Sequence, residues 1–327
     1  MKTVKKPLHF TISVLFTLLI LTVAFVLSFN SYRKTAAIVI SATNKLFNEL
    51  VLEVAQNIKA TYSPVIQTVS LLSYTQAIQG KNLEERLGSI SLMVDVLKHA
   101  PGMSGLQVGY ESGDYFIVRP LPSRYEIDLF AAPEDAAYVV DDIAMNDSGT
   151  GTMRRIFLNR KLQELERLDP VPSSYDVRTR PWFIQAMESP AVVSTSPYYF
   201  YFLHKVGVTI SRQVPGGAAV VAVDATLEQI SSTISRVSFA PHEETVLLSG
   251  KDGRVLASKN QGHVVQRDGD RLILPSLAGL GSGVLGYVAD NVELKPGELW
   301  FSYQGDDWLG MIADWYCATV ADGGTGR

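Results

Sequence analysis

The stretch Tyr175-Asp-Val-Arg-Thr-Arg-Pro-Trp-Phe183 gathers two arginines and three aromatic side chains around one proline. Arg178 and Arg180 each carry a planar guanidinium, which suits two parallel hydrogen bonds to a carboxylate or phosphate. The tryptophan and phenylalanine after the proline are large apolar rings that can line a pocket. A structural interpretation competes, in which Pro181 starts a short helix, the tryptophan is core and the arginines are solvated. Local chemistry alone favours this structural interpretation, so the surrounding elements must decide.

The N-terminal segment is long and apolar enough to cross a membrane. Residues 7–32 contain no Asp, Glu, Lys or Arg, and a transmembrane helix needs about 20 apolar residues. Three lysines before the segment favour a cytoplasmic N-terminus. A cleavable signal peptide is the alternative, but the exit at 28–34 lacks an Ala-x-Ala pattern. We therefore predict a cytoplasmic N-terminus at 1–7, an uncleaved transmembrane helix at 8–30 and an extracytoplasmic remainder.

The helical pattern continues beyond the membrane segment without a flexible linker. Apolar residues recur at spacings of three and four from Leu46 to Leu72, which predicts a long helix at 31–80. Pro64 interrupts this pattern and is expected to kink the helix rather than to end it. Such an amphipathic helix is suited to mechanical coupling and to a homodimer interface. Alternatively it packs on its own domain, and both arrangements can hold for different parts of its length.

The composition argues against several classes of function. The net charge is −4 and no basic tract is present, which argues against a nucleic-acid partner. Cys317 is the only cysteine, so an intrachain disulfide is not possible. The five histidines are scattered, with no pair at helical spacing, so we expect neither a metal site nor a cofactor. No pairing of a nucleophile with a base is evident, which argues against an enzyme.

Beyond the long helix, the pattern predicts an α+β fold. A helix at 83–100 is expected before a hairpin of strands 106–110 and 115–118, since a turn with Gly and Asp joins two apolar runs. Further strands are expected at 137–143, 152–158, 162–168, 196–202, 206–212 and 218–223, and helices at 180–187 and 227–237. Together these elements form a predicted domain at 81–240.

A shorter second domain is predicted at 241–316. It is expected to hold one hairpin and two further strands, at 244–249, 254–258, 283–288 and 298–303. The segment 281–286 matches Gly-x-Gly-x-x-Gly, but a dinucleotide site needs a strand before this motif and a helix after it. We interpret the match as a loop. The tail at 317–327 is predicted to be disordered.

The motifs of the central region follow one another in a specific order. After Tyr175–Phe183 come Ser-Pro-Tyr198, Gly-Val-Thr-Ile-Ser-Arg212 and Val-Ala-Val-Asp-Ala-Thr-Leu227. This ordered set resembles the double Cache sensor domains of bacterial transmembrane receptors, above all those joined to adenylate or guanylate cyclases. Chemotaxis receptors and histidine kinases use the same sensor. The resemblance runs from the anchor to about Trp315. It implies two tandem PAS-like domains with antiparallel sheets, the first membrane-distal and the second membrane-proximal.

The resemblance also implies a ligand site in the membrane-distal domain. In relatives that bind amino acids, residues matching Arg180 and Trp182 hold the ligand carboxylate, and residues matching Tyr198 and Asp224 help to hold the amino group. Relatives place an aspartate where this chain has Phe200, so a standard α-amino acid ligand is disfavoured. The complete set of predicted ligand-binding residues is Tyr110, Tyr175, Arg178, Arg180, Trp182, Phe183, Tyr198, Phe200 and Asp224.

Two of these residues also have a structural interpretation. Arg180 can form a salt bridge with Asp176 or Asp224, and we weigh this equally with a ligand contact. Asp224 can instead cap the helix that begins near Leu227.

The sequence thus predicts the sensory part of a receptor in the bacterial inner membrane, which binds a small carboxylate-bearing metabolite and forms a homodimer through the long helix. A second membrane helix and an output domain, such as a nucleotide cyclase, are expected to follow residue 316. The competing classes are a membrane-anchored extracytoplasmic enzyme and a structural envelope protein.

Overall fold

The computed structural model describes residues 8–99, 102–146, 149–235, 243–249, 252–260, 266–268 and 271–312. It divides into two units, of which one comprises the chain up to Leu52 together with the segment from Lys295, and the other comprises Glu53–Leu294. The domain boundaries expected from the sequence, at 80 and 240, stay predictions. The predicted cytoplasmic N-terminus and the predicted disordered tail lie outside the described residues.

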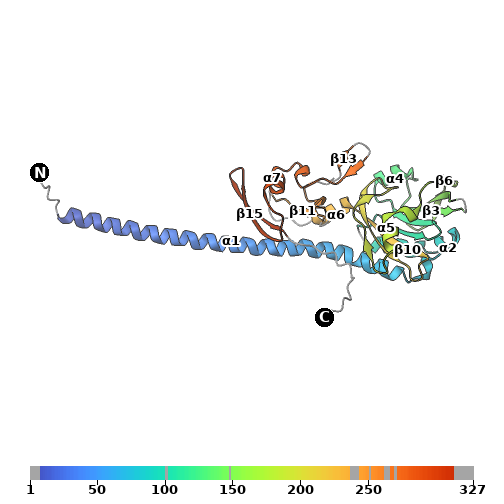
Figure 1. Cartoon of the computed structure of the whole chain (residues 1–327), viewed down its shortest axis with the longest axis horizontal. Helices are drawn as coiled ribbons and strands as arrows, with labels where there is room; N and C mark the ends of the chain where they lie inside the picture. Colours follow the sequence, from blue (N-terminus) through green and yellow to red (C-terminus); the bar gives the residue numbers. More distant parts are fainter. Residues whose placement is uncertain are drawn as a thin grey trace. The chain divides into compact units, whose positions relative to one another are not determined.

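The first element is α1 (Leu8–Leu72), a single helix of 65 residues. An 18-residue window within its segment Ile12–Thr43 has a mean hydropathy of 2.7 and is not buried by the described chain. By length and composition this segment can cross a membrane, and it overlaps the transmembrane helix predicted at 8–30. Pro64 lies inside the helix and does not end it, as predicted. Figure 1 shows α1 as the long blue helix.

The C-terminal end of α1 belongs to the core of the second unit. Tyr62, Val65, Val69 and Leu72 are buried there, at successive spacings of three, four and three residues. This spacing puts the four side chains on one face of the helix. The end of α1 therefore packs on its own domain, which is one of the two arrangements expected. The helix stops at Leu72 rather than at 80, and a 3-10 turn, η1 (Gln76–Ile78), follows.

The second unit is built on one large sheet in which every strand pairing is antiparallel. Its strand order is β5-β4-β3-β2-β1-β10-β9-β7, with β6 beside β4 and β8 beside β9. The strands are β1 (Gly105–Tyr110), β2 (Tyr115–Pro120), β3 (Tyr138–Met145), β4 (Gly151–Leu158), β5 (Glu164–Arg167), β6 (Val171–Ser173), β7 (Val193–Ser194), β8 (Tyr198–Tyr199), β9 (Val206–Gln213) and β10 (Ala219–Thr226). The predicted α+β fold with an antiparallel sheet is confirmed.

The helices of this unit differ from the prediction at two places, one of which is an additional helix at Arg124–Phe130 that was not predicted. The single helix expected at 83–100 is two helices, because the chain turns at Gly88 and Ser89. The helices are α2 (Leu83–Leu87), α3 (Ile90–His99), α4 (Arg124–Phe130), α5 (Pro181–Met187) and α6 (Leu227–Ile234), with a 3-10 turn η2 (Val177–Thr179) before α5. The strand expected at 196–202 is shorter than predicted, since only β8 is extended there.

The two faces of the central strands carry two separate hydrophobic cores. Leu106, Val108, Val221 and Val223 point into the core that also holds the end of α1. The alternating residues Tyr115, Ile117, Val220 and Ala222 point into the core that holds Trp182 and Phe183. This separation follows from the period of two residues along a strand. The predicted site residues are therefore divided between opposite faces of one sheet.

The C-terminal segments form small two-stranded sheets, each antiparallel. They are β11 (Val246–Leu248) with β12 (Val255–Ser258), β13 (Gln266–Asp268) with β14 (Arg271–Ile273), and β15 (Gly297–Tyr303) with β16 (Asp306–Ile312). The strand predicted at 283–288 is wrong. That segment is a helix, α7 (Gly283–Asn291), which follows a 3-10 turn, η3 (Ala278–Leu280). The side chain of Ser282 accepts a hydrogen bond from the amide of Leu285 and so caps the helix, a signal that outweighs the short apolar run.

Candidate functional site

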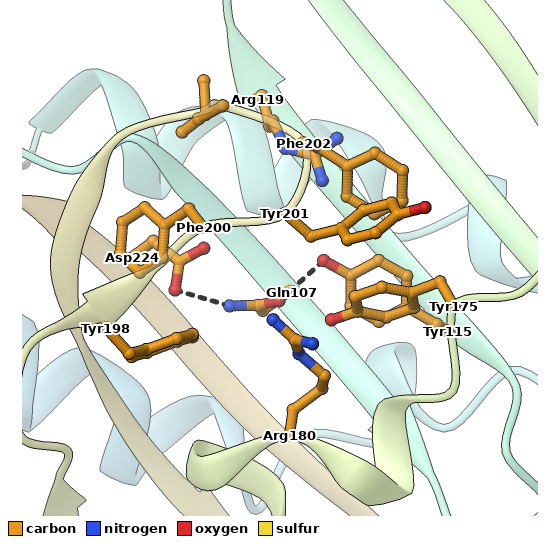
Figure 2. A pocket seen from close by; sticks show the side chains of 11 residues that line it. Gln107, Tyr115, Arg119, Tyr175, Arg180, Tyr198, Phe200, Tyr201, Phe202 and Asp224 are labelled. Carbon is orange, nitrogen blue, oxygen red and sulfur yellow. Dashed lines mark hydrogen bonds between the residues drawn. The ribbon is translucent and has the colours of Figure 1, made fainter. Parts of the chain in front are cut away.

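A small cavity lies on the face of the sheet that also carries Trp182 (Figure 2). Its base is made by β1, β2 and β10, and its walls by the segments before α5 and after β8. The lining residues are Gln107, Tyr115, Arg119, Tyr175, Arg180, Tyr198, Phe200, Tyr201, Phe202, Leu203 and Asp224. The centre of a water molecule can move through about 20 Å³ of this cavity. By this measure one water needs roughly 10–15 Å³, so the cavity has room for one or two waters.

Asp224 is the buried end of a hydrogen-bond network at the base of the cavity. Its Oδ1 accepts a hydrogen bond from Nε2 of Gln107 at 2.6 Å and another from Oγ1 of Thr209 at 2.6 Å. The hydroxyl of Tyr198 lies 2.7 Å from the same Thr209 oxygen. The hydroxyl of Tyr115 donates to Oε1 of Gln107 at 2.7 Å. Two tyrosines of the cavity are therefore connected to one carboxylate.

Burial controls the protonation of this carboxylate. Because Asp224 is only 6% exposed, burial raises its pKa to about 6, against the opposing effect of the hydrogen bonds and of Arg119. Burial also raises the pKa of Tyr175 to about 12, so this hydroxyl stays protonated and can donate. No described residue donates a hydrogen bond to Oδ2 of Asp224, which leaves this oxygen available.

Arg180 stands at the wall of the cavity, directly before the first residue of α5. Its guanidinium carbon lies 5.3 Å from the ring centroid of Tyr175. Its Nε is buried and has no hydrogen-bond acceptor among the residues that the structure describes. The salt bridge expected as an alternative is not formed within the described chain, since Asp176 pairs with Arg178 at 2.9 Å. Arg180 is thus a cation with an unused donor beside an aromatic cavity.

A second arginine of the cavity, Arg119, is already compensated. Its Nη1 lies 2.7 Å from Oδ2 of Asp141, and Nε of Arg155 lies 2.7 Å from Oδ1 of the same carboxylate. Burial opposes ionisation, yet the two arginines hold the pKa of Asp141 below its usual value. The Arg119 guanidinium also lies 4.7 Å from the ring centroid of Phe202. Arg119 therefore holds the aromatic wall and is committed to Asp141.

The structure brings five of the nine predicted site residues together. These five line the cavity: Tyr175, Arg180, Tyr198, Phe200 and Asp224. The capping role considered for Asp224 falls instead to Thr226, whose side chain accepts from the amide of Gln229. Figure 2 shows Tyr198 and Phe200 on the side of Asp224, and Tyr175 beside Tyr115 across Gln107.

The other four predicted residues do not line the cavity. Trp182 and Phe183 are 1% and 5% exposed and pack in the core under α5. Arg178 is partly exposed and pairs with Asp176. Tyr110 lies on the opposite face of the sheet, where its hydroxyl donates to the carbonyl of Ile78 at 2.8 Å. These four residues support the architecture around the cavity rather than its lining.

Sequence reasoning missed several lining residues. Gln107, Tyr115 and Arg119 lie on the first hairpin, where alternation could have placed Tyr115 and Arg119 on one face, two positions either side of Ile117. Gln107 and Arg119 each stand between two apolar residues, so the local sequence gave no sign of a polar site. Tyr201 and Phe202 were expected to continue a strand, whereas they form with Leu203 a turn that closes the cavity.

Comparisons with known proteins support the resemblance noted in the sequence. No model of a known protein family matches the chain. Adenylate cyclase 1 of Rhizobium meliloti is 30% identical over 148 residues, which cover 45% of this chain and 22% of that protein. The methyl-accepting chemotaxis protein McpA of Bacillus subtilis is 30% identical over 104 residues, which cover 32% of this chain and 16% of that protein. The predicted resemblance to bacterial cyclases and chemotaxis receptors is confirmed.

The matches cover only part of each curated relative. The chain spans about a fifth, or less, of the length of the curated relatives it matches. Among solved structures, the ligand-binding domain of the Campylobacter jejuni chemoreceptor Tlp3, in complex with 4-methylisoleucine, matches with a TM-score of 0.49 and 13% identity. That match covers 83% of this chain and 86% of that chain.

Proposed function

We propose that this chain is the sensory region of a bacterial transmembrane receptor, and that the cavity of Figure 2 binds a small carboxylate-bearing metabolite. The observation that carries the proposal is the state of Arg180, whose buried Nε has no acceptor among the described residues. A buried donor without a partner is costly, and a ligand carboxylate would supply the partner. The aromatic rings around the cavity would exclude water from this contact.

The ligand must enlarge the cavity in order to enter it. Space for one or two waters does not hold a metabolite, so the wall made by Tyr201, Phe202 and Leu203 has to move. A ligand that binds only the enlarged state shifts the population toward that state. This coupling between occupancy and wall position is what a sensor requires.

In the proposed receptor, the segment Ile12–Thr43 of α1 crosses the inner membrane and the sheet-containing unit lies outside the cytoplasm. α1 carries the change from the ligand-binding unit toward the membrane, and two copies associate through α1. The output is carried by a further domain, of the nucleotide cyclase or chemotaxis type, in agreement with the relatives of this chain. The chain itself acts as a sensor and catalyses no reaction.

A thermal-shift screen of the full chain in detergent tests the proposal. The panel comprises organic acids, amino acids, amines, purines and sugars. A ligand at about 100 times its dissociation constant adds roughly 2.7 kcal/mol to the free energy of unfolding. The expected result is a stabilising carboxylate whose effect disappears in Arg180→Ala. If no carboxylate stabilises the protein, or if the effect survives in this variant, the proposed function is wrong.

A further inference from the structure

We propose that the preferred ligand of the cavity is a zwitterion whose cationic nitrogen carries alkyl groups in place of N–H groups, that is, a carboxylate of the betaine type. This inference rests on the proposed function and names the ligand class of the same site. It is carried by the charges that face the cavity, by the acceptors that surround Asp224, and by the rings beside that carboxylate.

The charges that face the cavity match a zwitterion. Arg119 is compensated by Asp141, and Arg155, which shares that carboxylate, is partly exposed to solvent. Arg180 and Asp224 then remain as one cation and one anion that form no ion pair within the described chain. A ligand with a single charge would leave one of these two groups uncompensated in a buried site, which is costly. A ligand with a carboxylate and a cationic nitrogen compensates both.

The free acceptor oxygens near Asp224 are fewer than the three N–H donors of a primary ammonium. Oδ1 of Asp224 already receives hydrogen bonds from Gln107 and Thr209, and Oε1 of Gln107 receives one from Tyr115. Oδ2 of Asp224 is the one carboxylate or amide oxygen of this network to which no described residue donates, and the hydroxyl oxygen of Tyr198 is a second acceptor beside it. A primary ammonium has three N–H donors, and each donor that is buried without an acceptor weakens binding. An alkylated nitrogen carries no such requirement.

The walls near Asp224 are aromatic rings, which attract a cation without accepting a conventional hydrogen bond. The ring centroids of Tyr198 and Phe200 are 5.2 Å apart with an interplanar angle of 77°. Figure 2 shows both rings beside Asp224. The rings of this cavity already accept cations, since the guanidinium groups of Arg119 and Arg180 lie over Phe202 and Tyr175. A methylated ammonium suits such a wall better than a hydrated one.

A glycine of β9 fixes the ring of Phe200 in this position. A Cβ atom on Gly207 would lie 2.4 Å from Cε2 of Phe200, so the ring rests directly on the strand backbone. Residue 200 therefore presents a ring and not a hydrogen-bond acceptor beside Asp224, and a ring can attract a cation through a cation–π contact.

Isothermal titration calorimetry on the full chain in detergent tests the inference with a methylation series. The probes are glycine, sarcosine, N,N-dimethylglycine and glycine betaine, which share one carboxylate and differ in the number of N-methyl groups. Affinity is expected to rise along the series, with glycine betaine binding at least about tenfold more tightly than glycine. Choline, which has the same cation without the carboxylate, is expected to bind more weakly than glycine betaine. A flat or reversed series overturns the inference.

Phe200 variants separate ring recognition from simple apolar contact. Phe200→Leu keeps an apolar side chain and is expected to weaken glycine betaine binding about tenfold, whereas Phe200→Tyr is expected to preserve it. Thermal unfolding of each variant shows whether the fold is intact. Glycine betaine binding that is unchanged in Phe200→Leu would overturn the inference. If other carboxylates bind through Arg180 while no member of the series binds, the inference fails and the proposed function stands.

Discussion

A Cβ atom placed on Gly109 would lie 2.8 Å from Cη2 of Trp182, so the tryptophan ring packs directly on the backbone of β1. Val177 and Phe183 approach the same position to 2.6 and 2.9 Å. On β9, which is separated from β1 by β10, the hydroxyl of Ser211 donates to the carbonyl oxygen of Trp182 at 2.9 Å. These contacts hold α5 against the sheet. Because Arg180 immediately precedes α5, they also determine where its guanidinium lies.

Substitution of Gly109 by alanine should therefore destabilise the protein. The added methyl group overlaps three packed side chains, and overpacking of a core costs about 1–3 kcal/mol. The measurement is thermal unfolding of the full chain in detergent. Gly286→Ala is the matched control, because its Cβ meets nothing within 4 Å and alanine favours the helix α7. A Gly109→Ala protein with the wild-type melting temperature would show that α5 is not held in this way.

Two arginines of one short segment should differ in their effect on ligand binding when each is replaced by alanine. Arg180→Ala is expected to abolish carboxylate binding while changing the free energy of unfolding by less than about 1 kcal/mol, because its Nε has no acceptor among the described residues. Arg178→Ala is the control, since Arg178 is exposed and pairs with Asp176 outside the cavity. This control should bind the ligand normally. Equal loss of binding in both variants would point to an effect of net charge and not of Arg180 itself.

The hydrophobic pattern predicted most strands of the sheet, and the ordered motifs predicted five of the eleven residues that line the cavity. Tyr175, Arg180 and Asp224 were found because the motif assigns them a chemistry and a place in the order of elements. Gln107 and Arg119 were missed because each stands between two apolar residues of its strand. Only the pairing of β1 with β2 and β10 brings them to the cavity. Pairing between strands is a long-range property that a local pattern does not contain.

The predicted residues outside the cavity show a second limit. The same motif predicts a ligand contact for Trp182 and for Arg180. The ring of Trp182 nevertheless points into the core, because Gly109 leaves room there. Tyr110 is close in sequence to Gln107, the residue of β1 that lines the cavity, but the alternation of the strand places Tyr110 on the opposite face. The motif therefore selected a segment that reaches the cavity, whereas backbone geometry decided which of its side chains line it.

Removal of the carboxylate that holds Arg119 should be strongly destabilising. Asp141 is fully buried and accepts from both Arg119 and Arg155, so Asp141→Asn leaves a buried arginine without its counter-ion. Such a change costs about 3–5 kcal/mol. Asp176→Asn removes a partly exposed ion pair with Arg178 and should cost less than about 1 kcal/mol. Thermal unfolding of the two variants compares these losses, and a similar small loss in both would refute the role given to Asp141.

The last prediction concerns the pH dependence that Asp224 gives to stability. Burial raises its pKa to about 6, well above the usual value of about 4 for an aspartate. The folded protein then binds this proton more tightly than the unfolded chain does. The contribution of Asp224 to the free energy of unfolding is therefore most favourable below pH 4, declines between about pH 4 and 6, and is constant above that range.

Asp224→Asn isolates this contribution, because the amide is neutral at every pH and its oxygen can still accept from Gln107 and Thr209. The other carboxylates titrate equally in both proteins, so the difference between the two melting temperatures reports on Asp224. The stability of the variant relative to the wild type should rise by about 2 kcal/mol between pH 4 and pH 6, since each pKa unit corresponds to about 1.4 kcal/mol and the two pKa values lie at the ends of this range. A difference that stays constant across this range would mean that Asp224 ionises as freely in the folded protein as in the unfolded chain.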